Sequence, residues 1–558
     1  MTQNVKHHIK RHMVLLLAVA SALTAANAQK KQNPVTVHGS LQTDILFPET
    51  DAKIGTETYS DKVLTNTYGD LGVYSKYVDG GLRVEYLEHP LPGFEPDFKG
   101  WGLANIYVKG RYKGLELTAG DFYEQFGSGF ILRTYQERAL GVDNSIRGGR
   151  LKVNAVKGLR LTALGGVQRR FWDWSTRSTL YGADVEFDIS DYAKKLSDRG
   201  ITWTLGASWV MKHERLEDIV VPGTNYSLNL PRNVSAFDVR TKYYRGGLNL
   251  LGEFAWKGQD PSFDNGYIYH HGTALLLSGS YSKKGWSAML QAKRSEDMSF
   301  RSRRSMSLAS AMINNMPAFS YQHTYALASL YPYATQAAPG EWAFQGAFAY
   351  TFARKTALGG KYGTRLKLNV SYIRGLDHKQ GDLFHGSTYG TDGGSTPFFK
   401  MGELNYQDIN VQLDKRLSSS VHLNVMYMNQ RYNKTVVEGH GGMVNSNIIV
   451  VEPQWKINRQ LQLRGEVQYL FTRQDQKDWA YGLLELSVRP YLMFSVSDMW
   501  NCGDTKTHYY MFNVTGKYRN NRLMLGYGRT RAGFNCSGGV CRYVPATRGF
   551  QISYNYSF

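Results

Sequence analysis

Three absences narrow the classes of protein that this sequence can encode. After the first 28 residues, no continuous apolar stretch is long enough to cross a bilayer as a helix, and the mean hydropathy is −0.40. No proline- or serine-rich joint and no low-complexity tract divides the 558 residues, so we expect one large domain. The motifs H-E-x-x-H, C-x-x-C and G-x-S-x-G are also missing, and Asp, Ser and His are scattered without a linking spacing. We therefore expect no enzyme, no metal site and no cofactor.

Aromatic residues, in contrast, are abundant. The chain has 38 Tyr, 25 Phe and 11 Trp but only 15 Pro. Aromatic side chains favour strands and proline interrupts them, so this composition predicts an all-β protein.

The N-terminus has the pattern of a secretory signal. A basic start, MTQNVKHHIKRH, precedes the apolar run MVLLLAVASAL, and Ala26-Asn27-Ala28 follows. A basic region, a short apolar region and an A-x-A site predict export with cleavage between Ala28 and Gln29. Because Gln29 is not a cysteine, a lipid anchor is not expected.

The charge of the mature chain is strongly positive. The predicted signal contains three of the 66 Lys and Arg and none of the 46 Asp and Glu, which leaves a formal charge of about +17. For an exported protein, we expect anionic lipid headgroups, lipopolysaccharide or anionic solutes as partners, and no nucleic acid.

Apolar and polar residues alternate with period two from about residue 100 onward. The pattern is clearest in LQLRGEVQYLF (461–471), RLKLNVSY (365–372) and INVQLDKR (409–416). Any antiparallel sheet with one wet face gives such alternation. Long strands whose apolar faces often end in aromatics favour a transmembrane barrel instead. In a barrel, the polar faces of these segments would line the lumen with Arg365, Lys367, Asp414, Arg416, Arg464 and Glu466.

Short polar turns and long inserts also alternate along the chain. Short turns are expected at Lys157-Gly158, Lys284-Gly285 and Asn520-Asn521. Short turns at one end and long loops at the other are typical of outer-membrane barrels, in which the long loops are extracellular. Alternating segments predict roughly 22 strands, within a range of about 18–26. A lumen of that width is filled by water or by folded-in loops. The long inserts span residues 215–236, 296–340, 376–403, 433–446 and 500–508.

The last residues, GFQISYNYSF, alternate strictly and end on an aromatic. Tyr554, Tyr556 and Phe558 share one face of this segment, and a terminal aromatic strand resembles the signal that barrel-assembly machinery recognises. We therefore expect residues 29–558 to form a barrel in the outer membrane of a Gram-negative bacterium.

The stretch Gly120–Arg150, GDFYEQFGSGFILRTYQERALGVDNSIRGGR, looks at first like an active site. Gly127-Ser128-Gly129 lacks the remaining residues of a phosphate loop and of a nucleophile elbow. Charges this dense cannot face lipid. Two interpretations remain, a constriction or plug inside the lumen and an extracellular hairpin held by ion pairs. The residues concerned are Asp121, Glu124, Arg133, Glu137, Arg138, Asp143 and Arg147.

A second unusual segment, Ser320–Trp342, is rich in tyrosine and closes the longest insert, which begins with Arg301, Arg303 and Arg304. Long loops in compact folds are usually functional or disordered, and the aromatic content favours order. The segment could form a sugar- or anion-binding rim, a docking face for a partner protein, or a loop packed on its own barrel.

Three cysteines are present. Cys536 and Cys541 lie in FNCSGGVCR before the last strand, and in an exported protein a local disulfide is expected between them. Cys502 is then unpaired in another loop.

Several stretches resemble a family of large outer-membrane barrel proteins of Bacteroidota that lacks an assigned activity. They are the 120–150 stretch, HTYALASLYPYATQ and CSGGVCRYVPATRGF, so the resemblance extends over the chain. It implies an outer-membrane barrel and no particular substrate. More loosely, the chain resembles porin-like barrels. Strand-like sequence (VTVHGSLQTDI) begins soon after Gln29, with no TonB box or N-terminal plug domain, so an energised transporter is not expected.

Two functions are consistent with these patterns. The first is a porin-like channel for small polar solutes, with a weak anion preference from the net-positive lumen. The second is a structural subunit of a larger outer-membrane assembly, for secretion or barrel insertion, whose loops bind other outer-membrane proteins.

Overall fold

The computed structural model of the protein describes residues 35–174, 177–307, 311–379, 381–537 and 540–558. The predicted signal sequence, residues 1–28, and its cleavage site at Ala28 and Gln29 lie outside the described residues, so both stay predictions.

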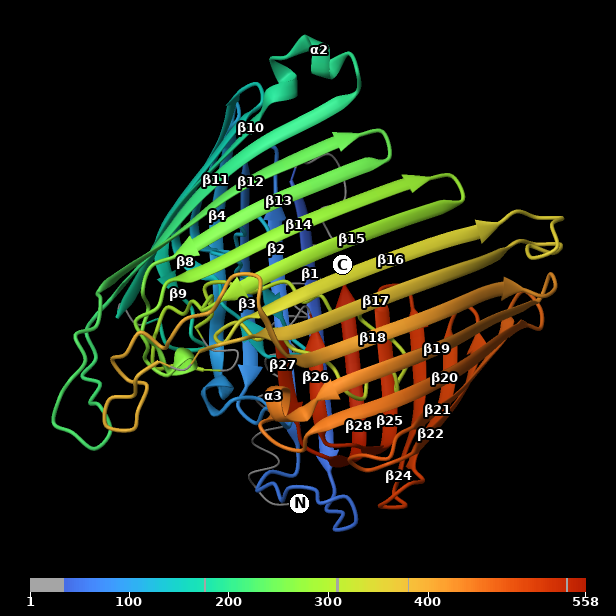
Figure 1. Ribbon diagram of the computed structural model, residues 1–558. Helices are drawn as coiled ribbons and strands as arrows, with labels where there is room; N and C mark the ends of the chain where they lie inside the picture. The colour runs from blue at the N-terminus through green and yellow to red at the C-terminus, as the bar shows by residue number, and fades with distance from the viewer. Residues whose placement is uncertain (1–34, 175–176, 308–310, 380, 538–539) are drawn as a thin grey trace.

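A closed antiparallel barrel of 24 strands forms the molecule (Figure 1). Each wall strand pairs with the next along the chain, and the last pairs with the first. The predicted all-β barrel is confirmed, and its even strand number lies within the expected range. The wall strands are β1 (Thr36–Pro48), β2 (Leu64–Tyr74), β3 (Val78–Leu87), β4 (Gly100–Tyr112), β5 (Leu115–Phe122), β8 (Ile146–Val156), β9 (Leu159–Gln168), β10 (Ser178–Asp188), β11 (Ile201–Glu214), β12 (Asn233–Arg245), β13 (Leu248–Lys257), β14 (Gly272–Lys283), β15 (Trp286–Glu296), β16 (Glu341–Phe352), β17 (Thr364–Leu376), β18 (Met401–Arg416), β19 (Val421–Asn433), β20 (Met443–Lys456), β21 (Leu461–Phe471), β22 (Trp479–Val488), β23 (Leu492–Asn501), β24 (His508–Tyr518), β25 (Asn521–Thr530) and β28 (Thr547–Ser557).

The connections contain a few short elements. Two small hairpins and five short helical turns are described: β6 (Gln136–Glu137) with β7 (Val142–Asp143), β26 (Gly533–Ser537) with β27 (Val540–Val544), and η1 (Pro96–Phe98), η2 (Ile189–Asp191), α2 (Lys194–Ser197), η3 (Phe263–Asn265) and α3 (Lys434–Glu438). Among the described residues, no helix has the length and apolar character needed to cross a membrane.

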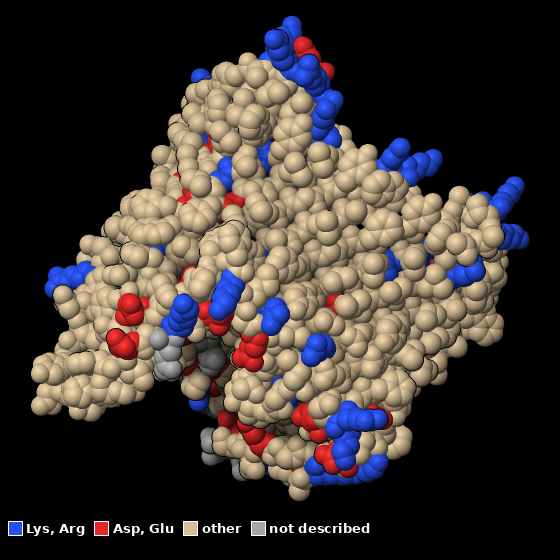
Figure 2. Space-filling model, in the orientation of Figure 1, with Lys and Arg blue, Asp and Glu red and all other residues tan. Residues whose placement is uncertain are grey.

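Alternation along each strand separates an apolar outer face from an inner face. On β21, Val467 is 65% exposed on the outside, whereas its neighbour Gln468 is 1% exposed inside. In Figure 2, few charged side chains lie on the broad middle of the visible wall, and most of them gather toward the two ends. A charge-poor outer band between two charged rims is the surface that a lipid-embedded barrel presents.

The two ends of the barrel differ in the length of their connections. Tight turns at one end include Lys157-Gly158 between β8 and β9 and Lys284-Gly285 between β14 and β15, as predicted. The turn between β24 and β25 is Arg519-Asn520, one residue earlier than predicted. Long loops occupy the other end, at the lower left and along the bottom of Figure 1. They include residues 215–232, 297–340, 377–400, 434–442 and 502–507, close to the long inserts expected from the sequence.

The strand β28 closes the barrel by pairing with β25 on one side and β1 on the other. Phe558 continues this pairing, because its amide donates to the Gly39 carbonyl at 3.0 Å and its own carbonyl accepts from the Gly39 amide at 3.2 Å. A Cβ at Gly39 would lie 2.2 Å from the Phe558 ring, so any larger residue there would have to displace this ring. Tyr554 and Tyr556 precede Phe558 on β28. Recognition of these aromatics by assembly machinery stays a prediction.

The main hydrophobic core lies inside the lumen. Two loops at the long-loop end, residues 123–145 and 297–340, bury apolar side chains such as Phe130 and Ile313 against inward wall residues such as Val210 and Ile448. We call them the first and second inward loops, and together the plug. Wall side chains alone cannot fill a barrel of this strand number, and here the inward loops fill it at one end.

Candidate functional site

The two inward loops bind each other and form one body. The Arg133 amide donates to the Ile313 carbonyl at 2.8 Å, and the Asn314 side-chain amide donates to the Phe130 carbonyl at 2.7 Å. The Asn144 side-chain amide reaches the Met312 carbonyl at 2.8 Å. Because these bonds join the loops backbone to backbone and side chain to backbone, we expect the plug to move as a unit.

The Gly-Ser-Gly turn of the first inward loop holds a carboxylate of the barrel wall. Glu253 of β13 accepts from the Ser128 amide at 2.8 Å and from the Ser128 hydroxyl at 2.6 Å. Gly127 has φ +52°, and a Cβ there would lie 2.5 Å from a Glu253 carboxylate oxygen. The turn therefore attaches the first inward loop to β13. Glycine at position 127 lets the Glu253 carboxylate approach the loop backbone closely.

Ion pairs fasten the first inward loop to the near wall. Asp143 pairs with Arg83 of β3 and with Arg169 beyond β9, the latter at 2.5 Å, and all three side chains are buried. Buried charges of this kind are tolerated only when paired and hydrogen-bonded. The remaining anchors of this loop are Arg138 to Asp70 (2.7 Å) and Glu124 to Arg150 (3.0 Å) and Lys152 (2.7 Å).

Three fully buried wall lysines hold the first half of the second inward loop. Lys212 of β11, Lys257 of β13 and Lys293 of β15 donate to the carbonyls of Arg301 (2.9 Å), Ser299 (2.7 Å) and Pro317 (2.8 Å), respectively. Each ammonium also faces a carboxylate: Asp260 lies 2.8 Å from Lys212, Glu341 lies 2.8 Å from Lys293, and Asp297 lies 3.9 Å from Lys257. Burial of an ammonium group without hydrogen-bond partners costs free energy, and the loop carbonyls supply these partners. The three lysines therefore hold the loop backbone against the wall.

The second half of this loop is fastened to the opposite part of the wall. His323 binds Asp408 of β18 at 2.6 Å, and the Tyr325 hydroxyl donates to Glu452 of β20 at 2.7 Å. The Leu327 amide donates to Gln468 of β21 at 2.8 Å. The second inward loop thus crosses the lumen from β11 to β21 at the long-loop end.

Burial shifts the pKa of titratable groups in the loops. Burial raises the pKa of Asp297 to about 6, although the Lys257 ammonium 3.9 Å away opposes the shift. Burial also raises the pKa of the Tyr333 hydroxyl well above its usual range, and the nearby Glu341 adds to this effect. In the loop after β25, burial lowers the pKa of Arg531, whose guanidinium donates to the Leu330 carbonyl at 3.3 Å.

The structure divides the predicted constriction residues into two groups. Glu124, Arg133, Glu137, Arg138 and Asp143 belong to the first inward loop. Asp121 and Arg147 instead lie in register on β5 and β8, where they pair at 2.8 Å. The Arg147 guanidinium also stacks on Trp174 at 3.6 Å. This pair belongs to the barrel wall. The charged stretch 120–150, predicted to act as one unit, is therefore divided between the wall and the first inward loop.

Within the first inward loop, Arg133 and Glu137 contribute differently from their neighbours. The Arg133 guanidinium lies over the Tyr135 ring at 5.2 Å, and Glu137 accepts from the Ala139 amide at 3.3 Å. These contacts are local, whereas Arg138 and Asp143 reach the wall.

The inward faces on the turn side of the plug form a polar vestibule. Lys367, Asp414 and Arg464 are partly exposed there, in contrast to the buried Asn369 and Asp408 closer to the plug. Arg464 pairs with Glu452 at 2.7 Å and also with Glu466. The other predicted lumen residues lie near the turn rim: Arg365 is opposite Asp414 in register, and Arg416 donates to the Ser419 carbonyl at 2.7 Å.

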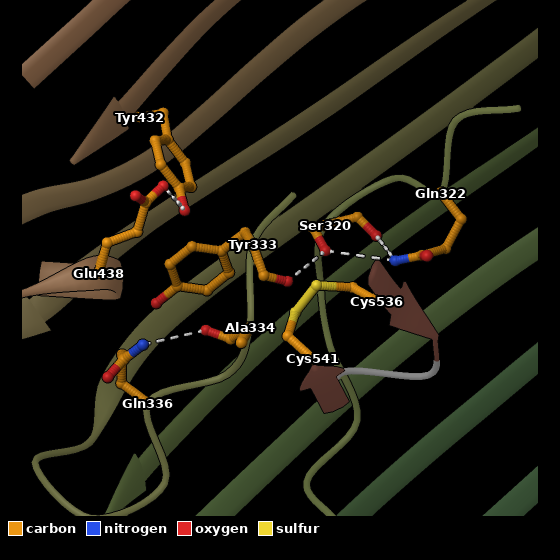
Figure 3. The surroundings of a disulfide bond; sticks show 9 residues. All are labelled: Ser320, Gln322, Tyr333, Ala334, Gln336, Tyr432, Glu438, Cys536 and Cys541. Atoms are coloured by element: carbon orange, nitrogen blue, oxygen red, sulfur yellow. Dashed lines mark hydrogen bonds between the residues drawn. A yellow bond between two sulfur atoms is a disulfide. The ribbon is translucent and has the colours of Figure 1, made fainter. Parts of the chain in front are cut away.

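Cys536 and Cys541 are joined as a disulfide across the β26–β27 hairpin (Figure 3). Residues of the second inward loop, among them Ser320 and Tyr333, lie in its surroundings. Leu327, Tyr331 and Tyr333 are at most 3% exposed, so the middle of the tyrosine-rich segment packs inside its own barrel. Cys502 is a free thiol near the Tyr469 hydroxyl, at 3.7 Å.

No group of three or more His, Cys, Asp or Glu side chains suited to a metal ion occurs in the part of the chain that the structure describes.

Sequence reasoning missed the wall groups that hold the plug. Lys212, Lys257, Lys293 and Glu253 occupy inward positions of strands that lead into or neighbour the long loops. A charged residue at an inward position near a strand end indicates a polar partner inside the barrel. It does not reveal which loop supplies that partner.

The chain matches the model of DUF6029, a family of unknown function, over residues 9–558. It belongs to this family. The membership confirms the resemblance to a family without an assigned activity, whereas the bacterial phylum stays a prediction. No curated protein matches the DUF6029 chain in sequence.

Several solved barrels align with this DUF6029 protein over most of its length. A mutant of the ferric enterobactin receptor PfeA of Pseudomonas aeruginosa is 11% identical, with a TM-score of 0.40 and coverage of 94% of this chain and 80% of the receptor. The translocation pore of the P pilus usher PapC is 9% identical, with a TM-score of 0.38 and coverage of 94% and 99%. A variant of OccD1 (OprD) is 10% identical, with a TM-score of 0.33 and coverage of 94% and 96%. At these identities and TM-scores the likeness extends to the barrel architecture only.

Proposed function

We propose that the protein is an outer-membrane barrel that passes small polar solutes, with a weak anion preference, when its plug is displaced. The observation that carries this proposal is the division of the lumen into a polar vestibule and a plug. The vestibule offers a polar path that the inward loops end. Glu452 and Glu466 compensate Arg464 there, so the weak anion preference rests on Arg365 and Lys367.

The attachment of the plug supports a gate. Both inward loops are held to the wall by hydrogen bonds and ion pairs, with chain connections only at their ends. At the neck of the second loop, the Met298 amide donates to the Ala337 carbonyl at 2.9 Å, so the loop leaves and re-enters the wall at one place. A loop attached in this way can be displaced without opening the barrel.

The second candidate function is an accessory subunit of a larger outer-membrane assembly. The extent of the buried core between plug and wall favours this alternative, because a plug that never leaves would be built in the same way. In either case the proposal includes no catalytic activity, cofactor or nucleic-acid partner.

Conductance in a planar bilayer tests the proposal. We expect the purified protein to be closed for most of the time, with voltage-dependent openings that prefer anions in a salt gradient. Replacement of residues 299–336 by a short Gly-Ser linker should give steady, large openings, because the neck between Met298 and Ala337 already closes the wall.

Charge variants of the vestibule separate the two candidates. Arg365→Glu combined with Lys367→Glu should lower the anion preference of the wild-type openings, while Lys400→Glu on an exposed outer loop serves as the control. A wild-type protein that stays silent at every voltage, with conductance only after the linker replacement, would favour the accessory subunit.

A further inference from the structure

An open cleft lies among the long loops and outside the plug. It has a volume of about 1100 Å³ and is lined by residues of loops 215–232, 258–271 and 377–400. These loops follow β11, β13 and β17, so the cleft joins distant parts of the chain. None of the residues already described as part of the plug or the vestibule lines it.

Hydrogen bonds join the three loops into one framework. The Tyr269 hydroxyl donates to the Asn229 carbonyl at 2.9 Å, and the Tyr269 amide donates to the Thr391 carbonyl at 2.8 Å. The rings of Tyr267 and Tyr389 lie 4.7 Å apart between the second and third loops. Because Tyr269 links both neighbouring loops, the cleft is formed before any ligand arrives.

The cleft exposes aromatic rings between hydrogen-bonding groups. Tyr226 is 65% exposed and Phe384 is 43% exposed, and their ring centroids lie 6.2 Å apart. Hydroxyl and amide groups of Ser227, Asn229 and Thr391 surround them. An aromatic ring exposed in a concave site is costly to hydrate, so these rings are available to cover a ligand.

The charges of the lining nearly cancel. Lys379 faces the cleft together with Asp382 and Asp392, in contrast to the strongly positive chain as a whole. A site for an anionic ligand needs a cluster of cations, which this lining does not supply. The chemistry therefore favours a neutral ligand that both donates and accepts hydrogen bonds.

Several backbone groups at the cleft are already paired. The Lys379 amide donates to the Ser395 carbonyl at 2.9 Å, and the Ser395 amide donates back at 3.2 Å. The Val221 amide is likewise bound to the Tyr226 carbonyl at 2.9 Å. A peptide that adds to an exposed strand edge needs free backbone groups, so side-chain recognition is favoured here.

We propose that this cleft binds a neutral oligosaccharide. A sugar ring has an apolar C–H face that can cover Tyr226 or Phe384, and hydroxyls that donate to Asp382 and Asp392 and accept from Asn229. An open cleft of this volume fits several linked rings better than one enclosed small molecule.

The test is binding of the full-length protein in detergent to an immobilised panel of neutral α- and β-linked hexose oligosaccharides, followed by titration of the best binder. Tyr226→Ala and Phe384→Ala should each weaken the affinity about threefold to tenfold. Phe399→Ala and Phe263→Ala are matched controls, because these rings are 82% and 57% exposed on the same loops but do not line the cleft. Both controls should bind as the wild type does.

The proposal is overturned if no member of the panel binds, or if the cleft and control variants bind equally. Binding only of a polyanion such as heparin, with loss in Lys379→Ala, would also overturn it, as would binding only of peptides. Bilayer conductance of Tyr226→Ala should equal that of the wild type, so failure of the binding proposal and failure of the channel proposal are distinguishable.

Discussion

At the scale of single residues, buried charges decide where the plug sits. Lys293 of β15 and Glu341 of β16 are both fully buried and lie 2.8 Å apart, and Lys293 also binds the Pro317 carbonyl of the second inward loop. Such a pair contributes little net free energy of folding when intact, but removal of one partner leaves an uncompensated charge. The pair therefore favours the observed position of the second inward loop over any position in which Lys293 loses the Pro317 carbonyl.

We expect Lys293→Met to lower the free energy of unfolding by about 3–5 kcal/mol, because Glu341 would stay buried without its partner. Denaturant unfolding in detergent micelles measures the change. The double variant Lys293→Met/Glu341→Gln should recover part of the loss, and Lys367→Met in the vestibule should be near wild type. A single variant as stable as the wild type would contradict the role of this pair.

The carboxyl of Asp297 gives a second prediction at this scale. Burial raises its pKa from 3.8 to about 6, with Lys257, Asp260 and His270 among the charged groups that act on it. Between those values the folded protein binds a proton that the unfolded chain has lost, so stability falls as pH rises from about 4 to 6 and then levels off. The shift corresponds to roughly 3 kcal/mol.

Unfolding measured across this pH window in the wild type and in Asp297→Asn tests the assignment. The variant should lack the Asp297 contribution to the slope, and equal slopes in the two proteins would refute it.

At the scale of the element, each strand separates lipid from lumen by its period of two. On β23, Val496 faces outward and is exposed, whereas the adjacent Ser495 lies opposite Glu485 in register. Val496→Arg should destabilise the folded protein in a bilayer by about 2–4 kcal/mol, because it places a charge in the lipid face. Ser495→Arg should cost much less, since Glu485 and water are available to it.

Folding into lipid vesicles over a denaturant series provides the measurement for this pair of variants. Equal costs for the two neighbours would contradict the assignment of the two faces.

The inward loops are the elements whose course a local pattern does not reveal. FGSGFILR in the first inward loop contains Phe126, Phe130 and Ile131, which are too apolar for a solvated hairpin. This composition indicates burial, but both a lumen and a neighbouring loop could provide it. Contacts with Glu253 and Ile313, far away in sequence, select the lumen.

At the scale of the whole molecule, closure leaves the barrel wall without an unpaired strand edge, because β28 pairs with both β1 and β25. A closed barrel filled by a packed plug should resist detergent. We therefore expect the unheated protein to migrate faster on denaturing gels than the boiled protein, and its circular dichroism to be dominated by strand. Identical migration with and without heating, or a substantial helical signal, would contradict the barrel in solution.

Local chemistry in the sequence determined the barrel, its inward and outward faces and the positions of its long loops. Alternation such as Val467 with Gln468 is a property of neighbouring residues. In a membrane the apolar face is favourable only toward lipid and the polar face only toward the lumen. The tertiary structure alone decided that loops 123–145 and 297–340 fill one end of the lumen, that Asp121 and Arg147 stay in the wall, and that Tyr269 joins three loops around a cleft. Those features depend on which of many charged and aromatic residues meet across the barrel, and such meetings are set by the closed geometry of all 24 strands together.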